Sequence, residues 1–478
     1  MTEVSITYAR LRATDPDRWL AVAVAWRQHA ATAGRWAAQI AARIGRITAA
    51  WTGAAAEAAT AHLEKLRRVA VQIQLHCWSA DQALSEWAGA LRRARALLSR
   101  GVEIATRAGL RVDDDGRVTP PVAPWFGQAM APIQDALRLA GAADAEATAR
   151  LAELADSLMS DLGAAPPPFP PPPAAPARVA VWWAGLTPAQ RFWLIATEPE
   201  LVGGRDGLPA ATRDLANRLL VDGRIDLDDP AGPRSYLLRA DHDHIVLASG
   251  DPDAASNVLT HVPGMAADQP RERDRAALVA ARATALDPAT ATSAVLWLGY
   301  DTPDTVPEAA GRDRAVAGAT ALRQFQAGLR AAHSDQTGRF TVLGHSYGSL
   351  VVGSAAATPG LEADAVVLVG SPGAGVDRAA DLAVPSVYAM SSVSDVVQYA
   401  APAPDALGRD LTATGLAPVL GPAAFGLPED ELWHGRNPVD DDFGARVVPS
   451  QPDAGHSGYW DPGRPALDGL ASITLGRV

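Results

Sequence analysis

Hydrophobic residues recur at steps of three and four along the first part of the chain. A helix start is signalled by Asp15-Pro16-Asp17, and an apolar stripe then runs to Trp51-Thr52-Gly53, where glycine permits a turn. A second stripe, from Leu63 to Leu91, alternates steps of three and four as a heptad seam does. The pattern predicts two long helices that pack as an antiparallel hairpin and bury both stripes. The members of the first stripe are Trp36, Ile40, Ile44, Ile47 and Trp51.

A proline run divides the chain into two parts of different character. Pro166 to Pro173, interrupted by Phe169, favours an extended polyproline II spacer. Before it, a small β-hairpin is expected around Asp113–Gly116 and a third helix over about 127–161. The predicted organisation is a helical domain over 1–163, a Pro-rich linker over 164–177 and a further domain over 178–478. The alternative is a surface loop within one domain.

After the linker, short β-type runs alternate with helical patterns. This alternation predicts an α/β domain with a mostly parallel sheet flanked by helices. Residues 178–222 are expected to form a helical lead-in, and the Pro-, Gly- and Asp-rich stretch 400–450 is a candidate lid. The expected strands are 236–239, 244–247, 257–262, 295–300, 340–343, 365–369 and 384–390, of which the first two are an antiparallel start.

The motif that carries chemistry is Gly344-His345-Ser346-Tyr347-Gly348. Four β-type residues precede it and a helical run of small residues follows, which is the strand, sharp turn and helix of a nucleophile elbow. Glycines at both ends remove side chains that would collide in so tight a turn. Ser346 is therefore the candidate nucleophile. The alternative is a tight turn with an idle serine.

A serine hydroxyl needs a base, and the elbow fold places the acid and then the base after the nucleophile. Only His434 and His456 follow Ser346; His456, in a glycine-flanked loop near the C-terminus, is the preferred base. Asp395 lies just past the strand expected at 384–390 and is the preferred acid, which would orient the imidazole. Asp405 and Asp410 are rivals farther along.

The oxyanion of acyl transfer needs two N–H donors. One is expected from Tyr347, the residue after the nucleophile. The other is expected from Gly264 or Met265, because the third strand ends in Pro263-Gly264-Met265.

The second half resembles the α/β-hydrolase superfamily, and more closely an actinobacterial family long labelled a domain of unknown function. The resemblance spans about residues 180–470 and implies a serine hydrolase with Ser346, Asp395 and His456. The segments that carry it are Trp182-Trp183-Ala-Gly-Leu186, Asp206-Gly-Leu-Pro209, Arg213-Asp214 with Asn217, Val262-Pro-Gly264, Trp297-Leu-Gly-Tyr300, Gly344–Ser349, Gly370-Ser-Pro-Gly373 and His456-Ser-Gly-Tyr459.

The helical hairpin, over about residues 15–105, resembles the WXG-type hairpins associated with type VII secretion. The likeness rests on Trp51-Thr52-Gly53 and the heptad seam. The Tyr-x-x-x-Asp/Glu motif of those substrates does not follow Leu98; Tyr300 and Asp304 have its spacing but lie far away in the sequence. A plain module for a protein partner or for dimerisation explains the hairpin equally well.

Composition excludes several other chemistries. The net charge is −12, so nucleic-acid binding is not expected at chain level. Lys65 is the only lysine among 42 basic residues, and no Gly-Lys-Ser/Thr step of a phosphate-binding loop exists. This arginine bias resembles actinobacterial composition. Cys77 is the only cysteine, so no internal disulfide and no Cys-x-x-Cys metal site can form.

No stretch of about 18 apolar residues predicts a membrane span, and residues 1–15 lack the pattern of a signal peptide. A cytoplasmic location is the default expectation, with type VII-like export without a signal peptide as the alternative. The predicted activity is hydrolysis of a small-molecule or lipid carboxylic ester, with no cofactor or metal. The alternatives are an amidase, peptidase or acyltransferase with the same triad, or a secreted or interaction protein whose helical module carries the function.

Overall fold

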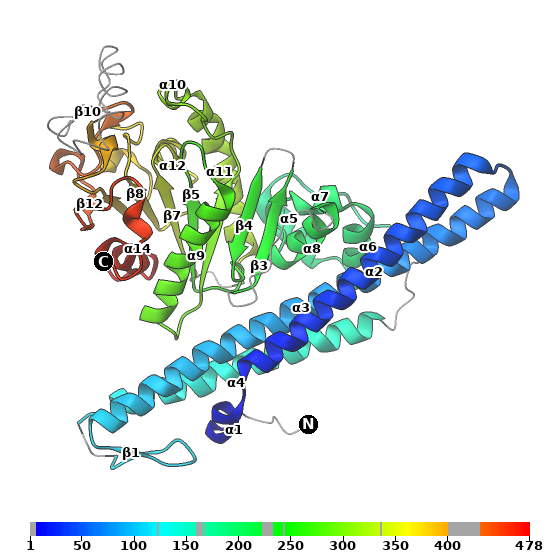
Figure 1. Ribbon diagram of the computed structural model, residues 1–478, viewed down its shortest axis with the longest axis horizontal. Helices are drawn as coiled ribbons and strands as arrows, with labels where there is room; N and C mark the ends of the chain where they lie inside the picture. Colours follow the sequence, from blue (N-terminus) through cyan, green and yellow to red (C-terminus); the bar gives the residue numbers. More distant parts are fainter. Residues whose placement is uncertain are drawn as a thin grey trace. The chain divides into compact units, whose positions relative to one another are not determined.

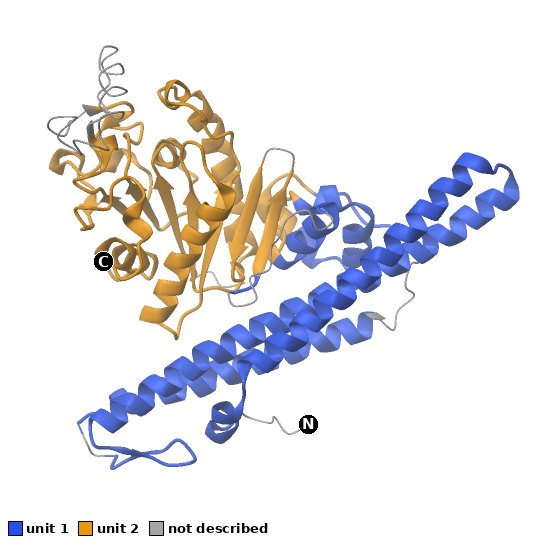
Figure 2. Cartoon of the chain, viewed as in Figure 1, with its two compact units in different colours: residues 1–172, 182–203, 211–234 blue, residues 173–181, 204–210, 235–478 orange. Residues whose placement is uncertain are grey.

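The computed structural model describes residues 6–121, 124–158, 166, 168–221, 233–241, 244–334, 337–399 and 431–478. The chain forms two compact units that are interleaved in sequence (Figure 2). Unit 1 comprises residues 1–172, 182–203 and 211–234, and unit 2 comprises residues 173–181, 204–210 and 235–478. Most of the expected lead-in, 178–222, therefore groups with the helical unit.

Unit 1 is built on a helical hairpin (Figure 1). Helix α2 (Pro16–Ala50) begins at Asp15, whose side chain accepts a hydrogen bond from the Asp17 N–H at 3.0 Å. Gly53 makes the turn with φ of 99°, a conformation that side chains other than glycine rarely adopt. Helix α3 (Ala54–Arg107) then returns along α2. The remaining elements of this part are α1 (Tyr8–Ala13), β1 (Arg111–Val112), β2 (Val118–Thr119) and α4 (Phe126–Leu158).

The two predicted apolar stripes differ in burial. The α3 stripe is buried or half-buried from Ala70 to Leu91, between α2 and α4. On α2, by contrast, small residues form the buried contact, and the large side chains of the predicted stripe stay half-buried or exposed. Alanine allows two helix backbones to approach closely, which turns the larger side chains to the flank of the interface. The buried non-proline residues of α2 are Ala23, Ala30, Ala33 and Ala37.

Helices that follow the proline run pack on α3. Helix α6 (Pro188–Thr197) begins with a capping box between Thr187 and Gln190. Its Phe192 ring stacks on the buried His76 ring of α3 at a centroid distance of 4.3 Å. The neighbouring helices are α5 (Pro176–Ala184), α7 (Pro199–Gly203) and α8 (Ala210–Val221).

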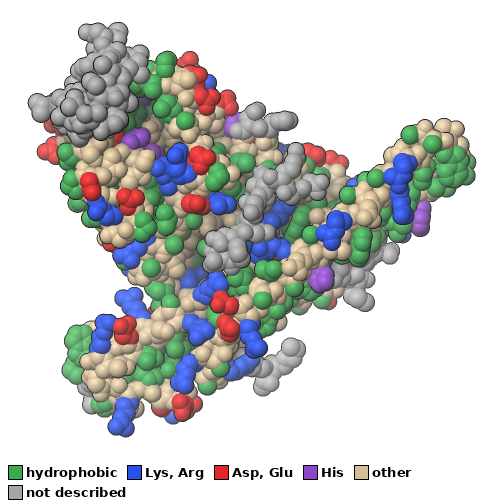
Figure 3. Space-filling model, viewed as in Figure 1, with side chains coloured by type: hydrophobic (Ala, Val, Ile, Leu, Met, Phe, Trp, Pro, Cys, Tyr) green, Lys and Arg blue, Asp and Glu red, His purple; other side chains and the backbone are tan. Residues whose placement is uncertain are grey.

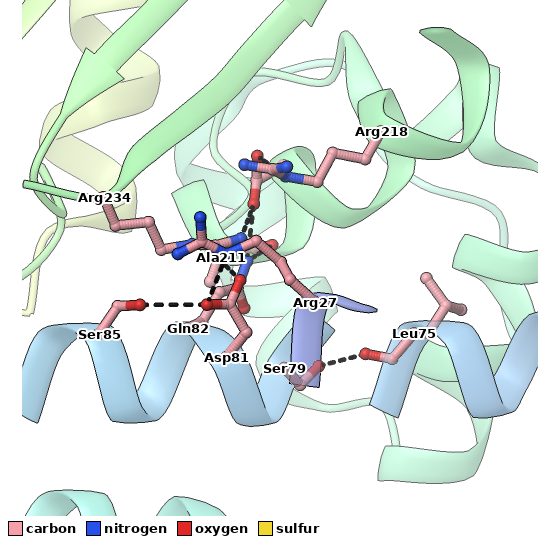
Figure 4. A network of polar contacts seen from close by, with 10 residues as sticks. Arg27, Leu75, Ser79, Asp81, Gln82, Ser85, Ala211, Arg218 and Arg234 are labelled. Carbon is pink, nitrogen blue, oxygen red and sulfur yellow. Dashed lines mark hydrogen bonds and ion pairs between the residues drawn. The ribbon is translucent and has the colours of Figure 1, made fainter. Parts of the chain in front are cut away.

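A buried ion network connects α2, α3 and α8 within unit 1 (Figure 4). Arg234 donates to the fully buried carboxylates of both Asp81 on α3 and Asp214 on α8, at 2.9 Å in the latter case. Arg27 Nε donates to Asp81 at 3.0 Å, and Arg218 Nε donates to Asp214 at 2.8 Å. Because these charges are paired out of water, they fix α8 and the residue that precedes the sheet to the helical hairpin.

Unit 2 contains an eight-stranded sheet. It is mostly parallel, as the sequence predicts, and it includes β12 in addition to the seven expected strands. Its strand order is β12-β9-β8-β7-β5-β6-β4-β3, in which β3 and β4 form the expected antiparallel start. The parallel strands end at a common edge, where α/β sheets carry their sites. The strands are β3 (Ser235–Ala240), β4 (Ile245–Ser249), β5 (Asn257–Val262), β6 (Thr292–Leu298), β7 (Arg339–His345), β8 (Ala365–Val369), β9 (Val387–Met390) and β12 (Arg446–Val447).

Helices flank this sheet in two pairs. Helix α9 (Gln269–Leu286) packs with α14 (Pro465–Thr474), and α11 (Asp313–Ala332) packs with α12 (Gly348–Ala356). Of the candidate lid, residues 400–430 lie outside the described residues. The remaining short elements are α10 (Val306–Ala309), β10 (Glu431–Leu432), β11 (Gly435–Arg436) and the 3₁₀ turns Ala379–Asp381, Val396–Tyr399, Asp441–Phe443 and Gly458–Trp460.

Candidate active site

The turn between β7 and α12 has the geometry of a nucleophile elbow. Ser346 has φ of 55°, a left-handed conformation that costs a non-glycine residue about 1–3 kcal/mol. Its N–H donates to the Val369 carbonyl at the end of the neighbouring strand β8, at 3.0 Å. This bond and the start of α12 hold the candidate nucleophile at the carboxyl edge of the sheet.

The two glycines of the motif are required by close backbone contacts. A Cβ atom at Gly344 would lie 2.6 Å from the Gly348 carbonyl oxygen. One at Gly348 would lie 2.1 Å from the Val262 carbonyl oxygen on β5. Both distances are shorter than real Cβ contacts, so only glycine fits at these positions without displacing backbone.

The predicted acid and base lie in hydrogen-bond contact. Asp395, five residues after β9, is fully buried, and His456 is part-exposed. His456 Nδ1 lies 2.9 Å from Asp395 Oδ1 and 3.1 Å from Oδ2. In the neutral ring the Nδ1–H donates to the carboxylate, which leaves Nε2 as the proton acceptor. This tautomer is the one in which a histidine can take a proton from a serine hydroxyl.

Gly370 links this pair to the elbow. It follows Val369, whose carbonyl accepts from the Ser346 N–H. A Cβ atom at Gly370 would lie 2.6 Å from Asp395 Oδ2 and 3.2 Å from His456 Nδ1. The His345 ring, adjacent to Ser346 in sequence, lies 4.7 Å from the His456 ring. The structure therefore brings the three predicted residues Ser346, Asp395 and His456 to one place.

Tyr459 is a further partner of the acid, which the sequence reasoning did not identify. Its hydroxyl donates to Asp395 Oδ2 at 2.5 Å and accepts from the Ser392 N–H at 3.0 Å. Burial and the neighbouring carboxylate raise the pKa of Tyr459 well above its usual value, so it remains a donor. The Val397 N–H donates to the other oxygen, Oδ1, at 3.0 Å. Both carboxylate oxygens are thereby fixed.

His345, the residue before Ser346 in the elbow motif, contacts the backbone of the candidate base His456. It is buried, and its Nε2 lies 2.9 Å from the backbone carbonyl oxygen of His456. Burial, and then the charge that His456 can carry, lower the pKa of His345 well below its usual value. The ring is therefore neutral, with the proton on Nε2 donated to that carbonyl. Trp460 packs edge-on against His345 with a centroid distance of 4.9 Å.

The predicted oxyanion loop lies against the elbow. A Cβ atom at Gly264 would lie 2.7 Å from Ser346 Cβ and 2.9 Å from the Tyr347 amide nitrogen. Tyr300 holds this loop by donating its hydroxyl to the Pro263 carbonyl at 2.7 Å. Met265 is 38% exposed. Gly264 and the Tyr347 amide are thus neighbours of the candidate nucleophile, on the two segments where the donors are expected.

The rival candidates are placed differently. His434 is buried, its Nε2 lies 2.8 Å from the Ala309 carbonyl oxygen, and burial lowers its pKa. Its ring packs edge-on against the Tyr347 ring at a centroid distance of 5.8 Å. The rival acids Asp405 and Asp410 lie outside the described residues.

Comparison with known proteins supports an α/β-hydrolase fold for part of the chain. Residues 240–404 match the family model described as alpha/beta hydrolase. The match covers the sheet from the end of β3 to β9, including the elbow and Asp395; His456 lies beyond it. No solved structure matches the chain.

Two mycobacterial relatives extend the comparison. The uncharacterized protein Rv2079 of Mycobacterium tuberculosis is 28% identical over 366 residues, which are 62% of this chain and 55% of that protein. The uncharacterized protein Mb0988c of Mycobacterium bovis is 36% identical over 140 residues, 27% of this chain and 52% of that protein. The chain thus spans about half the length of the curated relatives it matches.

These findings support a place for this chain in the hydrolase superfamily. They do not test the likeness of the hairpin to WXG-type hairpins, which stays a prediction. Within the described ranges, no group of three or more His, Cys, Asp or Glu side chains is arranged to hold a metal ion. None of the helices in those ranges is both long and apolar enough to cross a bilayer.

Proposed function

We propose that this chain is a serine hydrolase that cleaves a carboxylic ester. The observation that carries the proposal is the strained Ser346 elbow beside the pair of buried Asp395 and part-exposed His456. A left-handed serine is costly unless the surrounding backbone fixes it, and such strain concentrates at reactive sites. The hydrogen-bonded acid and base supply the activation that a serine hydroxyl lacks by itself.

In the proposed reaction, Ser346 Oγ attacks the ester carbonyl carbon while His456 Nε2 takes the hydroxyl proton. Asp395 holds the ring and stabilises the imidazolium that forms. The oxyanion accepts hydrogen bonds from the Tyr347 N–H and from the N–H of Gly264 or Met265. His456 then gives its proton to the leaving alkoxide, and the acyl group stays on Ser346.

The second half of the cycle releases the acid. His456 takes a proton from water, the resulting hydroxide attacks the acyl-enzyme carbonyl, and the Ser346 oxygen leaves with the proton held by His456. An ester is favoured over an amide because an alkoxide leaves more easily than an amide nitrogen, which must be protonated first. Acyl transfer to an alcohol would use the same steps with the alcohol in place of water.

The proposal is tested with a fluorophosphonate probe, read by intact mass on the full chain. We expect one probe per molecule in the wild type, none with Ser346→Ala, and a strong loss of labelling rate with His456→Ala. Ser457→Ala is the matched control, because Ser457 is an exposed serine beside His456. His434→Gln tests the rival base and should label as the wild type does.

The same variants are tested for esterase activity. With p-nitrophenyl esters, Ser346→Ala should lower kcat by at least about 10⁴-fold. Matched anilides should react far more slowly than the esters if the ester assignment is right. A folded wild type that takes no probe and hydrolyses no ester would overturn the proposal. Labelling that survives Ser346→Ala would show that another residue is the nucleophile.

A further inference from the structure

The turn end of the helical hairpin extends past the helices that cover the rest of α3. Near the end of α4, Ser157 Oγ lies 2.7 Å from His76 Nε2, and α6 meets α3 at His76 and at Arg68, which lies over the Trp193 ring. From there to the turn, α2 and α3 continue as a pair (Figure 1). We call residues 35–68 the hairpin tip. Its α3 part extends roughly 20 Å beyond Arg68 at 1.5 Å per residue.

Large apolar side chains are exposed on the hairpin tip. Trp36 is 53% exposed, Trp51 is 48% exposed and Leu66 is 42% exposed. They belong to stripes whose periodicity is typical of a buried helix face. Ile40, Ile44 and Ile47 are only half-buried. Among the described residues, Ala37 and Ala56 are the tip's only buried hydrophobic residues, so the tip presents apolar surface to its surroundings.

The hairpin tip is also basic within an acidic chain. It carries six basic residues against two acidic ones, a net charge of +4, whereas the whole chain carries −12. Arg43, Arg46 and Lys65 are exposed. Figure 3 shows basic side chains beside apolar ones along the helical hairpin. The six basic residues are Arg35, Arg43, Arg46, Lys65, Arg67 and Arg68, and the two acidic residues are Glu57 and Glu64.

We propose that the hairpin tip is a docking surface for an anionic lipid bilayer. Indole rings favour the boundary between headgroups and acyl chains, and arginine and lysine pair with anionic headgroups while their stems stay in apolar contact. The tip projects and has open space around Gly53, where an added Cβ would meet nothing within 4 Å. A projecting basic end with tryptophans fits a flat anionic surface better than it fits the side of one partner helix.

Distance explains how an acidic chain can approach such a surface. Charges separated by more than the Debye length, about 8 Å at physiological ionic strength, are largely screened. The tip extends more than two such lengths past its last contact with α6. Attraction of the tip is therefore felt before repulsion from the acidic residues of α4, which carries five acidic and two basic residues.

The proposal is tested by vesicle flotation of the full chain, and it is independent of Ser346. Phosphatidylcholine vesicles containing phosphatidylglycerol should carry the protein to the top of the gradient, and vesicles of phosphatidylcholine alone should not. Binding should weaken as salt rises. Arg43→Gln with Arg46→Gln should weaken binding about 30-fold, at about 1 kcal/mol for each basic residue near the surface. Trp36→Ala with Trp51→Ala should weaken binding by at least about tenfold.

Matched controls lie at the opposite end of the same helical arrangement. Trp125→Ala removes a tryptophan that is 52% exposed, and Arg111→Gln with Arg117→Gln removes two exposed basic charges. These variants should bind vesicles as the wild type does. Equal losses for tip and control variants, or no binding to anionic vesicles, would overturn the proposal. So would a stable dimer in solution whose dissociation requires the two tip tryptophans, because a second copy would then be the occupant.

Discussion

Replacing Asp81 by asparagine tests whether the buried ion network holds the helical unit together. Asp81 is fully buried and accepts hydrogen bonds from Arg27, Arg234 and Ser85. The amide keeps the shape of the side chain but removes its charge. Arg234, whose side chain is 2% exposed, then loses its ion pair with Asp81 and keeps its ion pair with Asp214, which also pairs with Arg218. Removing one partner of a buried ion pair costs about 3–5 kcal/mol, because the remaining charge is uncompensated.

The same hairpin offers a matched control. Asp17 also joins α2 to α3, through Arg92 at 2.7 Å, but its side chain is 75% exposed. Asp17→Asn should cost at most about 1 kcal/mol, because water screens that pair. For a unit of this size each kcal/mol lowers Tm by about 2–4 °C. Asp81→Asn should therefore lower the Tm of the helical unit by about 6–20 °C, and Asp17→Asn by at most about 4 °C.

Circular dichroism at 222 nm follows the helices, and hydrogen exchange of peptides from α3 and α8 separates unit 1 from unit 2. A double-mutant cycle with Arg234→Gln isolates the coupling of the pair. We expect faster exchange in both α3 and α8 with Asp81→Asn. Equal Tm shifts for the two aspartates, or an exchange change confined to α3, would refute the argument that the network joins these helices.

Three further predictions concern the candidate site. Tyr459→Phe removes the hydroxyl that donates to Asp395 and should lower the free energy of unfolding in urea by about 1.5–3 kcal/mol. It should also lower kcat for esters more than it raises KM. An unchanged kcat would contradict the positioning role of Tyr459. Gly264→Ala puts a Cβ 2.7 Å from Ser346 Cβ and 2.9 Å from the Tyr347 amide nitrogen, so the backbone must shift. It should lower kcat about 10²–10³-fold, together with a loss of Tm; activity within twofold of wild type would remove this loop from the oxyanion site. The third concerns pH, because the pKa of His345 is lower in the folded protein than in the unfolded chain. Below about pH 6.5 the unfolded chain binds a proton on His345 that the folded protein does not bind. The free energy of unfolding should therefore fall as the pH drops below about 6.5. His345→Gln keeps a donor for the His456 carbonyl and should flatten that slope by up to about 1.4 kcal/mol per pH unit; an unchanged slope in urea titrations would show that His345 does not carry it.

The elbow and the positions of the central strands along the chain could be predicted because their causes are local. Short runs rich in aliphatic residues specify the central strands, and close backbone contacts require Gly344 and Gly348 in this turn. The base was expected from a glycine-flanked loop, and the structure places that loop after β12, a strand of only two residues. The candidate acid was expected from its position just past β9. These inferences needed no knowledge of side-chain packing.

Contacts between distant residues explain what the sequence did not reveal. Tyr459 reaches Asp395 across 64 positions, and His345 reaches the His456 carbonyl across 111. Neither pairing has a periodic signal, although Tyr459 stands in the His456-Ser-Gly-Tyr459 segment and His345 stands in the elbow motif. The grouping of α8 with the helical unit likewise depends on Arg234 and Asp81, 153 positions apart.

The hairpin shows a limit of periodicity itself. A stripe of large apolar residues predicts which face of a helix is apolar, but it does not say whether another part of the chain covers that face. On α2 the alanines at 23, 30, 33 and 37 allow closer approach and take the interface, and Trp36 and Trp51 are left outside it. The pattern was read correctly as amphipathic and wrongly as fully buried.

Strain connects the two loops of the candidate site. Among the described residues, Ser346 and Ala266 are the two non-glycine residues with positive φ, at 55° and 48°. One is the candidate nucleophile, and the other follows Gly264 and Met265 on the candidate oxyanion loop. Each is held by a backbone bond to another segment, Ser346 to Val369 and Ala266 to Pro303. Because a left-handed backbone costs energy at a non-glycine residue, the surrounding packing must stabilise both residues. The acyl transfer that we propose would require the two loops in this arrangement.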